Sequence, residues 1–104
     1  MFKLPTEEEI DLMEGLLNVA SDSTRLKILC ALLNGEVEPV EKSVSELVVE
    51  AGVSQSLVSH QLKVLKDADL VDFRKEKTRS FYYLKDEHVK QLLEVVYDHI
   101  REKM

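Results

Sequence analysis

Apolar residues recur at intervals of three or four in the first third of the chain, the period of an amphipathic helix. Thr6 begins a capping-box pattern, so a first helix is predicted over roughly residues 6–20. A second helix is predicted to begin at a cap, Asp22 or Ser21, and to end at Gly35. Its apolar positions are Leu26, Leu29, Leu32 and Leu33.

Two shorter helices are predicted after an acidic loop at residues 36–43. Ser45 is the expected cap of the first, which ends at Gly52. Ser54 is the expected cap of the second, which begins near Gln55. Two short helices joined by a tight turn that contains glycine are typical of a helix-turn-helix motif.

The second of these helices separates apolar and polar residues onto opposite faces. Its inward positions are Leu57, Val58, Leu62 and Leu65. Its outward positions, here called the reading face, are Gln55, Ser56, Ser59, His60 and Lys63. Such polar side chains can hydrogen-bond base edges in a major groove, and Lys63 can bind a phosphate. An ordinary solvated helix face has the same pattern, so both interpretations stay open.

Two alternating segments, residues 70–74 and 80–84, predict a β-hairpin joined by the charged residues 75–79. The hairpin is expected to be a wing whose basic side chains reach the DNA backbone, or else a charged tip that keeps the chain soluble. These side chains are Arg74, Lys75, Lys77 and Arg79. The expected fold is mainly α with a small β-hairpin, a single winged helix-turn-helix DNA-binding domain over residues 1–104.

The last nineteen residues read D-x-H-x10-H-x2-E on a helix that Asp86 is expected to cap. His88 and His99 share nearly one face but lie about 16 Å apart along the axis, too far to share one ion. If two copies of this helix pack antiparallel, Asp86 and His88 of one chain come opposite His99 and Glu102 of the other. Two imidazoles and two carboxylates form a tetrahedral set for Zn²⁺. The alternative is a capped helix with solvated histidines.

Two adjacent stripes on the same helix favour such pairing. One has heptad spacing and consists of His88, Leu92, Val95, His99 and Glu102. The other is apolar and consists of Val89, Leu93, Val96 and Ile100. One stripe can face the core of its own chain and the other a partner, so a homodimer through the N- and C-terminal helices is expected.

Composition and charge narrow the class of protein. With 44% apolar and 33% charged residues, three Gly and two Pro, the chain resembles a helix-rich soluble protein. The net charge of −6 opposes DNA binding only if it is evenly spread, and residues 54–83 carry six Lys/Arg against four Asp/Glu. Neither a membrane-length apolar run nor a signal peptide is recognisable, so a cytoplasmic protein without membrane contact is expected. Cys30, the one cysteine, is predicted to be buried.

Three segments together resemble the ArsR/SmtB family of metal-sensing repressors: residues 21–29, residues 54–63 and the closing D-x-H-x10-H-x2-E. The resemblance implies a homodimer, not an enzyme, that binds an inverted-repeat operator when it holds no metal. It implies release when metal fills sites between the C-terminal helices, and regulated genes for metal efflux or sequestration.

Departures from the family pattern favour one metal. Some relatives carry a thiolate site where this chain reads Glu-Leu-Val-Val-Glu at residues 46–50, so the soft ions Cd²⁺, Pb²⁺ and trivalent arsenic are not expected. Zn²⁺ is the expected effector, and Co²⁺ is expected to fill the same site in vitro. Two further departures concern glycine. Asp69 stands where relatives often have Gly, and Asp can adopt the left-handed conformation that such a position favours. The wing turn at Glu76-Lys77 also lacks the usual Gly.

The resemblance also implies a link from metal to DNA, in which His99 donates its second N–H to the carbonyl of Asp69. Two other functions remain open. One is a winged-helix repressor with a non-metal effector or none, and the other is a protein that buffers zinc without acting on DNA.

Overall fold

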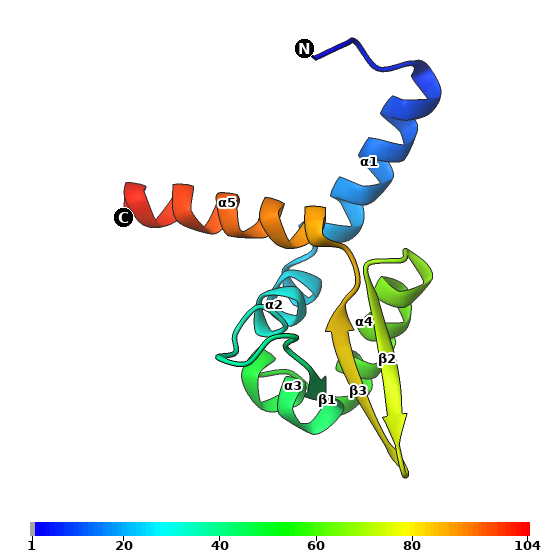
Figure 1. Cartoon of the computed structure of the whole chain (residues 1–104), viewed down its shortest axis with the longest axis vertical. Coiled ribbons are helices and arrows are strands. Elements are labelled where there is room, and N and C mark those ends of the chain that lie inside the picture. The colour runs from blue at the N-terminus through cyan, green and yellow to red at the C-terminus, as the bar shows by residue number, and fades with distance from the viewer. Residues whose placement is uncertain (1) are drawn as a thin grey trace.

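The computed structural model describes residues 2–104 and contains five helices and three short strands (Figure 1). In chain order the elements are α1 (Glu7–Ser21), α2 (Ser23–Ala31), β1 (Lys42–Ser43), α3 (Val44–Ala51), α4 (Gln55–Asp67), β2 (Val71–Glu76), β3 (Arg79–Leu84) and α5 (Glu87–Lys103). This order confirms the predicted mainly α fold with a β-hairpin wing. None of the helices in these residues is both long and apolar enough to cross a membrane.

The hydrophobic core lies where α2, α3 and α4 meet. Side chains from all three helices are almost completely removed from solvent, and Leu70 and Val71 at the start of β2 extend this cluster. The core residues of the three helices are Ile28, Leu29, Ala31, Leu47, Ala51, Val58, Leu62 and Leu65. The first half of α5 adds Val89 and Leu93. Because α3 and α4 contribute side chains to this core, apolar burial helps to hold the geometry of the helix-turn-helix.

Most of the helix starts lie at the predicted caps. Thr6 forms its capping box with Glu9, and the side chains of Asp22, Ser54 and Asp86 accept backbone N–H groups at the starts of α2, α4 and α5.

The predicted cap at Ser45 is wrong, because α3 begins two residues earlier. Ser43 caps this helix and forms a capping box with Glu46, which lies three positions on. A cap at Ser45 would place the apolar Val48 at the position where a capping box needs Glu or Gln. The Ser43 N–H also holds the pKa of Glu46 below its ordinary value.

The predicted end of α2 at Gly35 is also wrong, since the helix ends at Ala31. Tight turns follow, with the Leu33 N–H donating to the Cys30 carbonyl at 3.0 Å. Gly35 has a packing role instead, because a Cβ at this position would lie 2.9 Å from Cγ2 of Val40. The loop after α2 therefore folds closely back over this residue.

The sheet has three antiparallel strands in the order β1-β3-β2, one more than the hairpin predicts. Strand β1 falls in the expected loop and pairs Lys42 with Tyr82 of β3. The wing strands reach further than predicted and pair Glu76 with Arg79, so Lys77 and Thr78 alone form the turn. Figure 1 shows the hairpin extending beyond the helical part of the molecule.

Helices α1 and α5 project away from the core, and much of their apolar surface is exposed (Figure 1). No residue of α1 is buried. Of the apolar stripe on α5, Val89 and Leu93 face the core of the chain, whereas Val96 and Ile100 are exposed. The apolar members of the heptad stripe, Leu92 and Val95, are exposed as well, Val95 by 65%.

Candidate nucleic-acid interface and metal half-sites

The reading face of α4 is solvent-exposed along its whole length. All five of its residues are exposed, while Val58, Leu62 and Leu65 are buried on the opposite side. Ser54 starts the helix by accepting the Leu57 N–H at 3.2 Å, which leaves Gln55 at the exposed N-terminal turn. The predicted separation of the two faces is therefore confirmed, and the polar face is free to approach a ligand as large as a duplex.

Lys63 at the end of the reading face has an acidic neighbour. Its Nζ lies 3.3 Å from Oδ2 of Asp67, one turn further along α4, and both side chains are more than two-thirds exposed. An exposed pair of this kind is weak and screened by salt. A phosphate can therefore replace the carboxylate at little cost.

The four basic residues of the wing differ in their surroundings. Arg74 is held by two carboxylates: its Nε lies 2.9 Å from Glu41 Oε1, and its Nη1 lies 2.9 Å from Glu76 Oε2. Arg79 stacks over the Phe81 ring at 5.3 Å. Lys75 and Lys77 make no ion pair within residues 2–104. Among the four residues predicted to contact phosphate, Lys75 and Lys77 are therefore the most available to a phosphate, and Arg74 is the least available.

Asp86 and His88, two of the four predicted metal ligands, lie together at the start of α5. Asp86 Oδ1 accepts the His88 N–H at 2.6 Å and lies 3.4 Å from His88 Nδ1. The His88 side chain is 94% exposed. Because capping uses Oδ1, the other carboxylate oxygen is available to a metal. The N-cap thus holds a carboxylate and an imidazole side by side.

His99 and Glu102 form the second pair, three positions apart near the other end of α5, and both are exposed. Within residues 2–104 of one chain, no three His, Cys, Asp or Glu side chains gather in a group that could hold a metal ion. Within the described residues of one chain, the four predicted ligands therefore do not come together in a common site.

The junction between α4 and β2 lies beside the start of α5. Asp69 has a φ of 66°, so it adopts the left-handed conformation that sequence reasoning allowed at this position. Lys85 contacts this junction twice: its N–H donates to the Leu70 carbonyl at 3.0 Å, and its Nζ lies 2.5 Å from Asp69 Oδ1. Lys85 belongs to no sequence motif, and no pattern in the chain singles it out.

Arg25 also joins elements that sequence reasoning left unconnected. Its Nε donates to the Val19 carbonyl of α1 at 2.6 Å, and its Nη1 donates to Gln61 Oε1 of α4 at 2.9 Å. The residue lies in the 21–29 segment, but its spacing gives no sign of the contact with Gln61. The side chain ties the end of α1 to the helix that carries the reading face.

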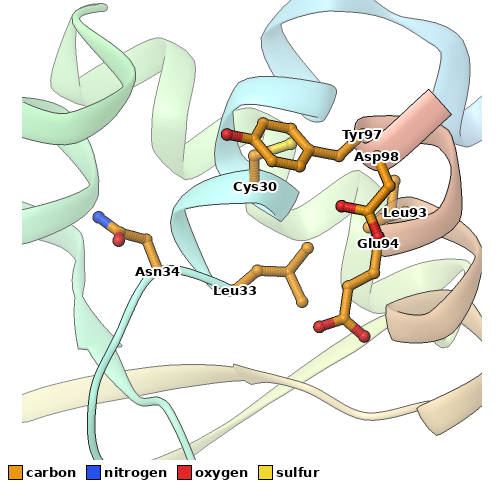
Figure 2. A pocket seen from close by; sticks show the side chains of 7 residues that line it. All are labelled: Cys30, Leu33, Asn34, Leu93, Glu94, Tyr97 and Asp98. Carbon is orange, nitrogen blue, oxygen red and sulfur yellow. The ribbon is translucent and has the colours of Figure 1, made fainter. Parts of the chain in front are cut away.

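The prediction that Cys30 is buried is wrong. The core-facing positions of α2 are Ile28, Leu29, Ala31 and Leu32. Cys30 points the other way and is exposed. It lines a cavity of about 720 Å³ between α2 and α5, together with Tyr97 and Asp98 of α5 (Figure 2). Partial desolvation still raises the pKa of the thiol, so little thiolate is present at neutral pH.

Helix α4 exposes a polar face, the hairpin carries basic side chains, and α3 and α4 are part of the hydrophobic core. These features together define a DNA-binding winged-helix protein. Residues 22–72 match the family described as "Bacterial regulatory protein, arsR family". The chain belongs to this family.

Known proteins agree with this assignment. The chain is 34% identical over 90 residues to the transcriptional repressor SmtB homolog of Synechocystis sp., covering 86% of this chain and 64% of that protein. It therefore spans just under two thirds of this curated relative.

Two solved structures share the fold. HlyU from Vibrio cholerae is 34% identical, with a TM-score of 0.78, and the match covers 89% of this chain and 96% of HlyU. A homodimeric winged helix-turn-helix DNA-binding domain from Mycobacterium bovis is 26% identical, with a TM-score of 0.74 over 98% and 93% of the two chains. These relatives are regulators or DNA-binding domains, in line with the expectation that the chain is not an enzyme.

Proposed function

We propose that this protein is a zinc-responsive transcriptional repressor of the cytoplasm. The homodimer without metal binds an inverted-repeat operator, and Zn²⁺ bound between the two α5 helices releases it, so that genes for metal efflux or homeostasis are expressed. The observation that supports the proposal is that the predicted ligands Asp86 and His88 lie at one end of α5 and His99 and Glu102 near the other, on a different helix from the reading face.

The exposed apolar surface of α1 and α5 supports a homodimer. Each helix leaves five large apolar residues exposed, and monomeric proteins rarely expose such continuous patches. They are Ile10, Leu12, Met13, Leu16 and Leu17 on α1, and Leu92, Val95, Val96, Tyr97 and Ile100 on α5. The homodimeric relative from M. bovis supports the same arrangement.

An antiparallel pair of α5 helices brings together complementary donors. Asp86 and His88 of one protomer then face His99 and Glu102 of the partner subunit, giving two nitrogen and two oxygen ligands per site. This donor set fits Zn²⁺, and Co²⁺ has the same tetrahedral preference in vitro. A bound ion supplies a bridge between protomers, which favours one separation of the two reading faces over others.

The predicted relay from His99 to Asp69 has to cross between protomers. Asp69 lies beside the start of α5 through its contact with Lys85, whereas His99 follows Asp86 by thirteen positions, or about 20 Å of helix. In an antiparallel pair, His99 of the partner subunit comes next to this start. The Asp69 carbonyl accepts no hydrogen bond within residues 2–104, so it is available to the imidazole N–H.

Fluorescence anisotropy on a labelled DNA duplex tests the proposal. The duplex is selected in vitro from random sequence by the metal-free protein, and zinc is then added. Zinc should release the wild-type protein, whereas His88→Ala and His99→Ala should bind the duplex normally and stay bound. Zinc-driven release that persists in both variants would place the effector site elsewhere, and failure to select any DNA would favour the zinc-buffering alternative.

The pH dependence of release gives an independent check. Zinc binds neutral imidazole, so protons compete with the metal for histidine ligands as the pH falls. More zinc should be needed to release the duplex at pH about 6 than at pH about 7.5. Equal zinc requirements at both pH values would argue against histidine ligands.

The cavity beside Cys30 supports a second candidate, a repressor with a non-metal effector. Its volume of about 720 Å³ is in the range of small-molecule sites, and it separates α5 from α2, which packs on both helices of the helix-turn-helix (Figure 2). On this hypothesis, filling the cavity by Cys30→Phe should change DNA affinity while zinc has no effect on the wild type. Under the metal proposal, Cys30→Phe should leave zinc-driven release intact.

A further inference from the structure

Lys85 connects the start of α5 to the residues that follow α4, the helix with the reading face. It stands between the end of β3 at Leu84 and the N-cap Asp86, so a single peptide bond separates it from a proposed metal ligand. Its N–H donates to the Leu70 carbonyl at 3.0 Å. Its Nζ lies 2.5 Å from Asp69 Oδ1.

Both acceptors are themselves fixed to α4. The Leu70 N–H donates to the Leu65 carbonyl in the last turn of α4 at 3.0 Å, and the Asp69 N–H donates to the Lys66 carbonyl at 2.9 Å. Leu65 and Leu70 are buried in the core. Lys85 is therefore connected to the last turn of α4 by two routes, one through the Leu70 backbone and one through the Asp69 side chain.

We infer that Lys85 is a positioning residue that couples the Asp86–His88 half-site to the orientation of the reading face within one protomer. This inference rests on the proposed zinc-dependent release. It differs from the relay through His99, because it uses a contact already present in a single chain. Any reorientation of Asp86 acts on the adjacent peptide, and Lys85 conveys it to Asp69 and Leu70.

We expect the Lys85–Asp69 ion pair to orient these two residues and to add little to the stability of the fold. Its carboxylate side is 77% exposed and its lysine side 45%, and exposed pairs add little to the free energy of unfolding. The Lys85 ammonium is charged at neutral pH, as for an ordinary lysine. A substitution that removes the charge should leave the fold intact, and its effect can be measured in folded protein.

The test compares three lysine variants in the DNA release assay. Lys85→Met keeps the length of the side chain but removes the charge, and Lys85→Arg restores a cation. Lys90→Met is the matched control, because the partly exposed Lys90 forms an ion pair at 3.0 Å with Glu38, which lies in the loop after α2 and not at the end of α4. Should Lys85→Met fold poorly, Asp69→Asn removes the same ion pair while tolerating the left-handed conformation.

We expect Lys85→Met to reduce the zinc-dependent change in DNA affinity by about tenfold, a typical size for an allosteric coupling. Lys85→Arg and Lys90→Met should retain the wild-type change. Cobalt affinity, read from the visible absorption of bound Co²⁺, should be unchanged in DNA-free Lys85→Met. Because coupling is reciprocal, DNA should weaken Co²⁺ binding in the wild type but hardly at all in Lys85→Met.

The outcomes separate this inference from the function on which it rests. Absence of zinc-driven release in the wild type would overturn the proposed function and the inference together. Wild-type release with the same affinity change in Lys85→Met would overturn the inference alone. Equal losses in Lys85→Met and Lys90→Met would show a general charge effect and would also overturn it.

Discussion

At the residue scale, Lys77 has an unfavourable backbone conformation in the turn of the β2–β3 hairpin. It has a φ of 60°, and it and Asp69 are the non-glycine residues with positive φ in residues 2–104. A left-handed conformation costs a side-chain-bearing residue about 1–2 kcal/mol, and glycine loses about 0.5–1 kcal/mol through its greater freedom when unfolded. We expect Lys77→Gly to raise the free energy of unfolding by about 0.5–1 kcal/mol, measured from the urea midpoint.

Thr78 is the control for this prediction. It shares the two-residue turn but has no positive φ, so Thr78→Gly should destabilise the protein. A lower urea midpoint for Lys77→Gly than for the wild type would show that the turn is not strained at Lys77.

Single residues were predictable where chemistry alone decides the conformation. The left-handed conformation of Asp69 agrees with the tolerance of Asp at a position where relatives often have Gly, and the cap at Asp86 followed from its capping chemistry. Cys30 was not predictable in this way. It lies among apolar neighbours in sequence, but the helix turns it toward α5, and its exposure depends on where that distant helix lies.

At the element scale, apolar periodicity together with cap and glycine signals located every helix. The exact ends of the helices were harder to predict, because they depend on which side chains pair. Ser43 and Ser45 both suit a cap, but only Ser43 has a Glu three positions on, and the structure shows the reciprocal contact between Ser43 and Glu46. The strand β1 was missed because two residues carry no alternation, and its pairing is set by β3, which lies far along the chain.

The cap of α3 can be tested with two matched variants. Ser43→Ala removes the oxygen that accepts the Glu46 N–H and should lower the free energy of unfolding by about 1 kcal/mol. Ser45→Ala, inside the helix and exposed, should change it little or raise it slightly through helix propensity. Chemical denaturation followed by circular dichroism measures both. The reverse order of effects would restore Ser45 as the cap.

The reading face of α4 predicts a separation of DNA binding from metal binding. Replacing Gln55, Ser56, Ser59 or His60 with Ala should weaken operator binding by about 1–3 kcal/mol where the residue makes a good base contact. Lys63→Ala should instead weaken all sequences alike and reduce the salt dependence. Zinc affinity, measured by chelator competition, should stay the same. Loss of zinc binding, or unaltered DNA affinity in all variants, would contradict the assignment of this face.

At the scale of the whole molecule, the sequence identified the four proposed ligands but not their route to α4. Spacing along one helix determines which donors share a face, and this information is local. The contacts of Lys85 with Leu70 and of Arg25 with Gln61 join segments distant in sequence, so no pattern reveals them. Single-chain structure in turn shows only half of each proposed site, since its completion depends on a partner.

The shared site predicts a specific result for mixed dimers. In a heterodimer of His88→Ala with His99→Ala chains, one site keeps all four ligands and the other loses both histidines. We expect one tightly bound zinc for each heterodimer and none for either homodimer, measured by chelator competition after purification on two different tags. The control pairs the wild type with a His88→Ala/His99→Ala chain. That dimer holds the same number of histidines, but each of its sites lacks one.

The control makes the two arrangements give opposite results. If each site drew its ligands from one chain, the wild-type/double-variant dimer would bind one zinc and the dimer of single variants would bind none. A helix rises about 1.5 Å per residue, so a straight α5 cannot bring its own two donor pairs together, and the intact length of α5 from Glu87 to Lys103 favours sharing. Tight zinc in the control dimer alone would therefore contradict both the shared site and the antiparallel pairing that places the partner's His99 near Asp69.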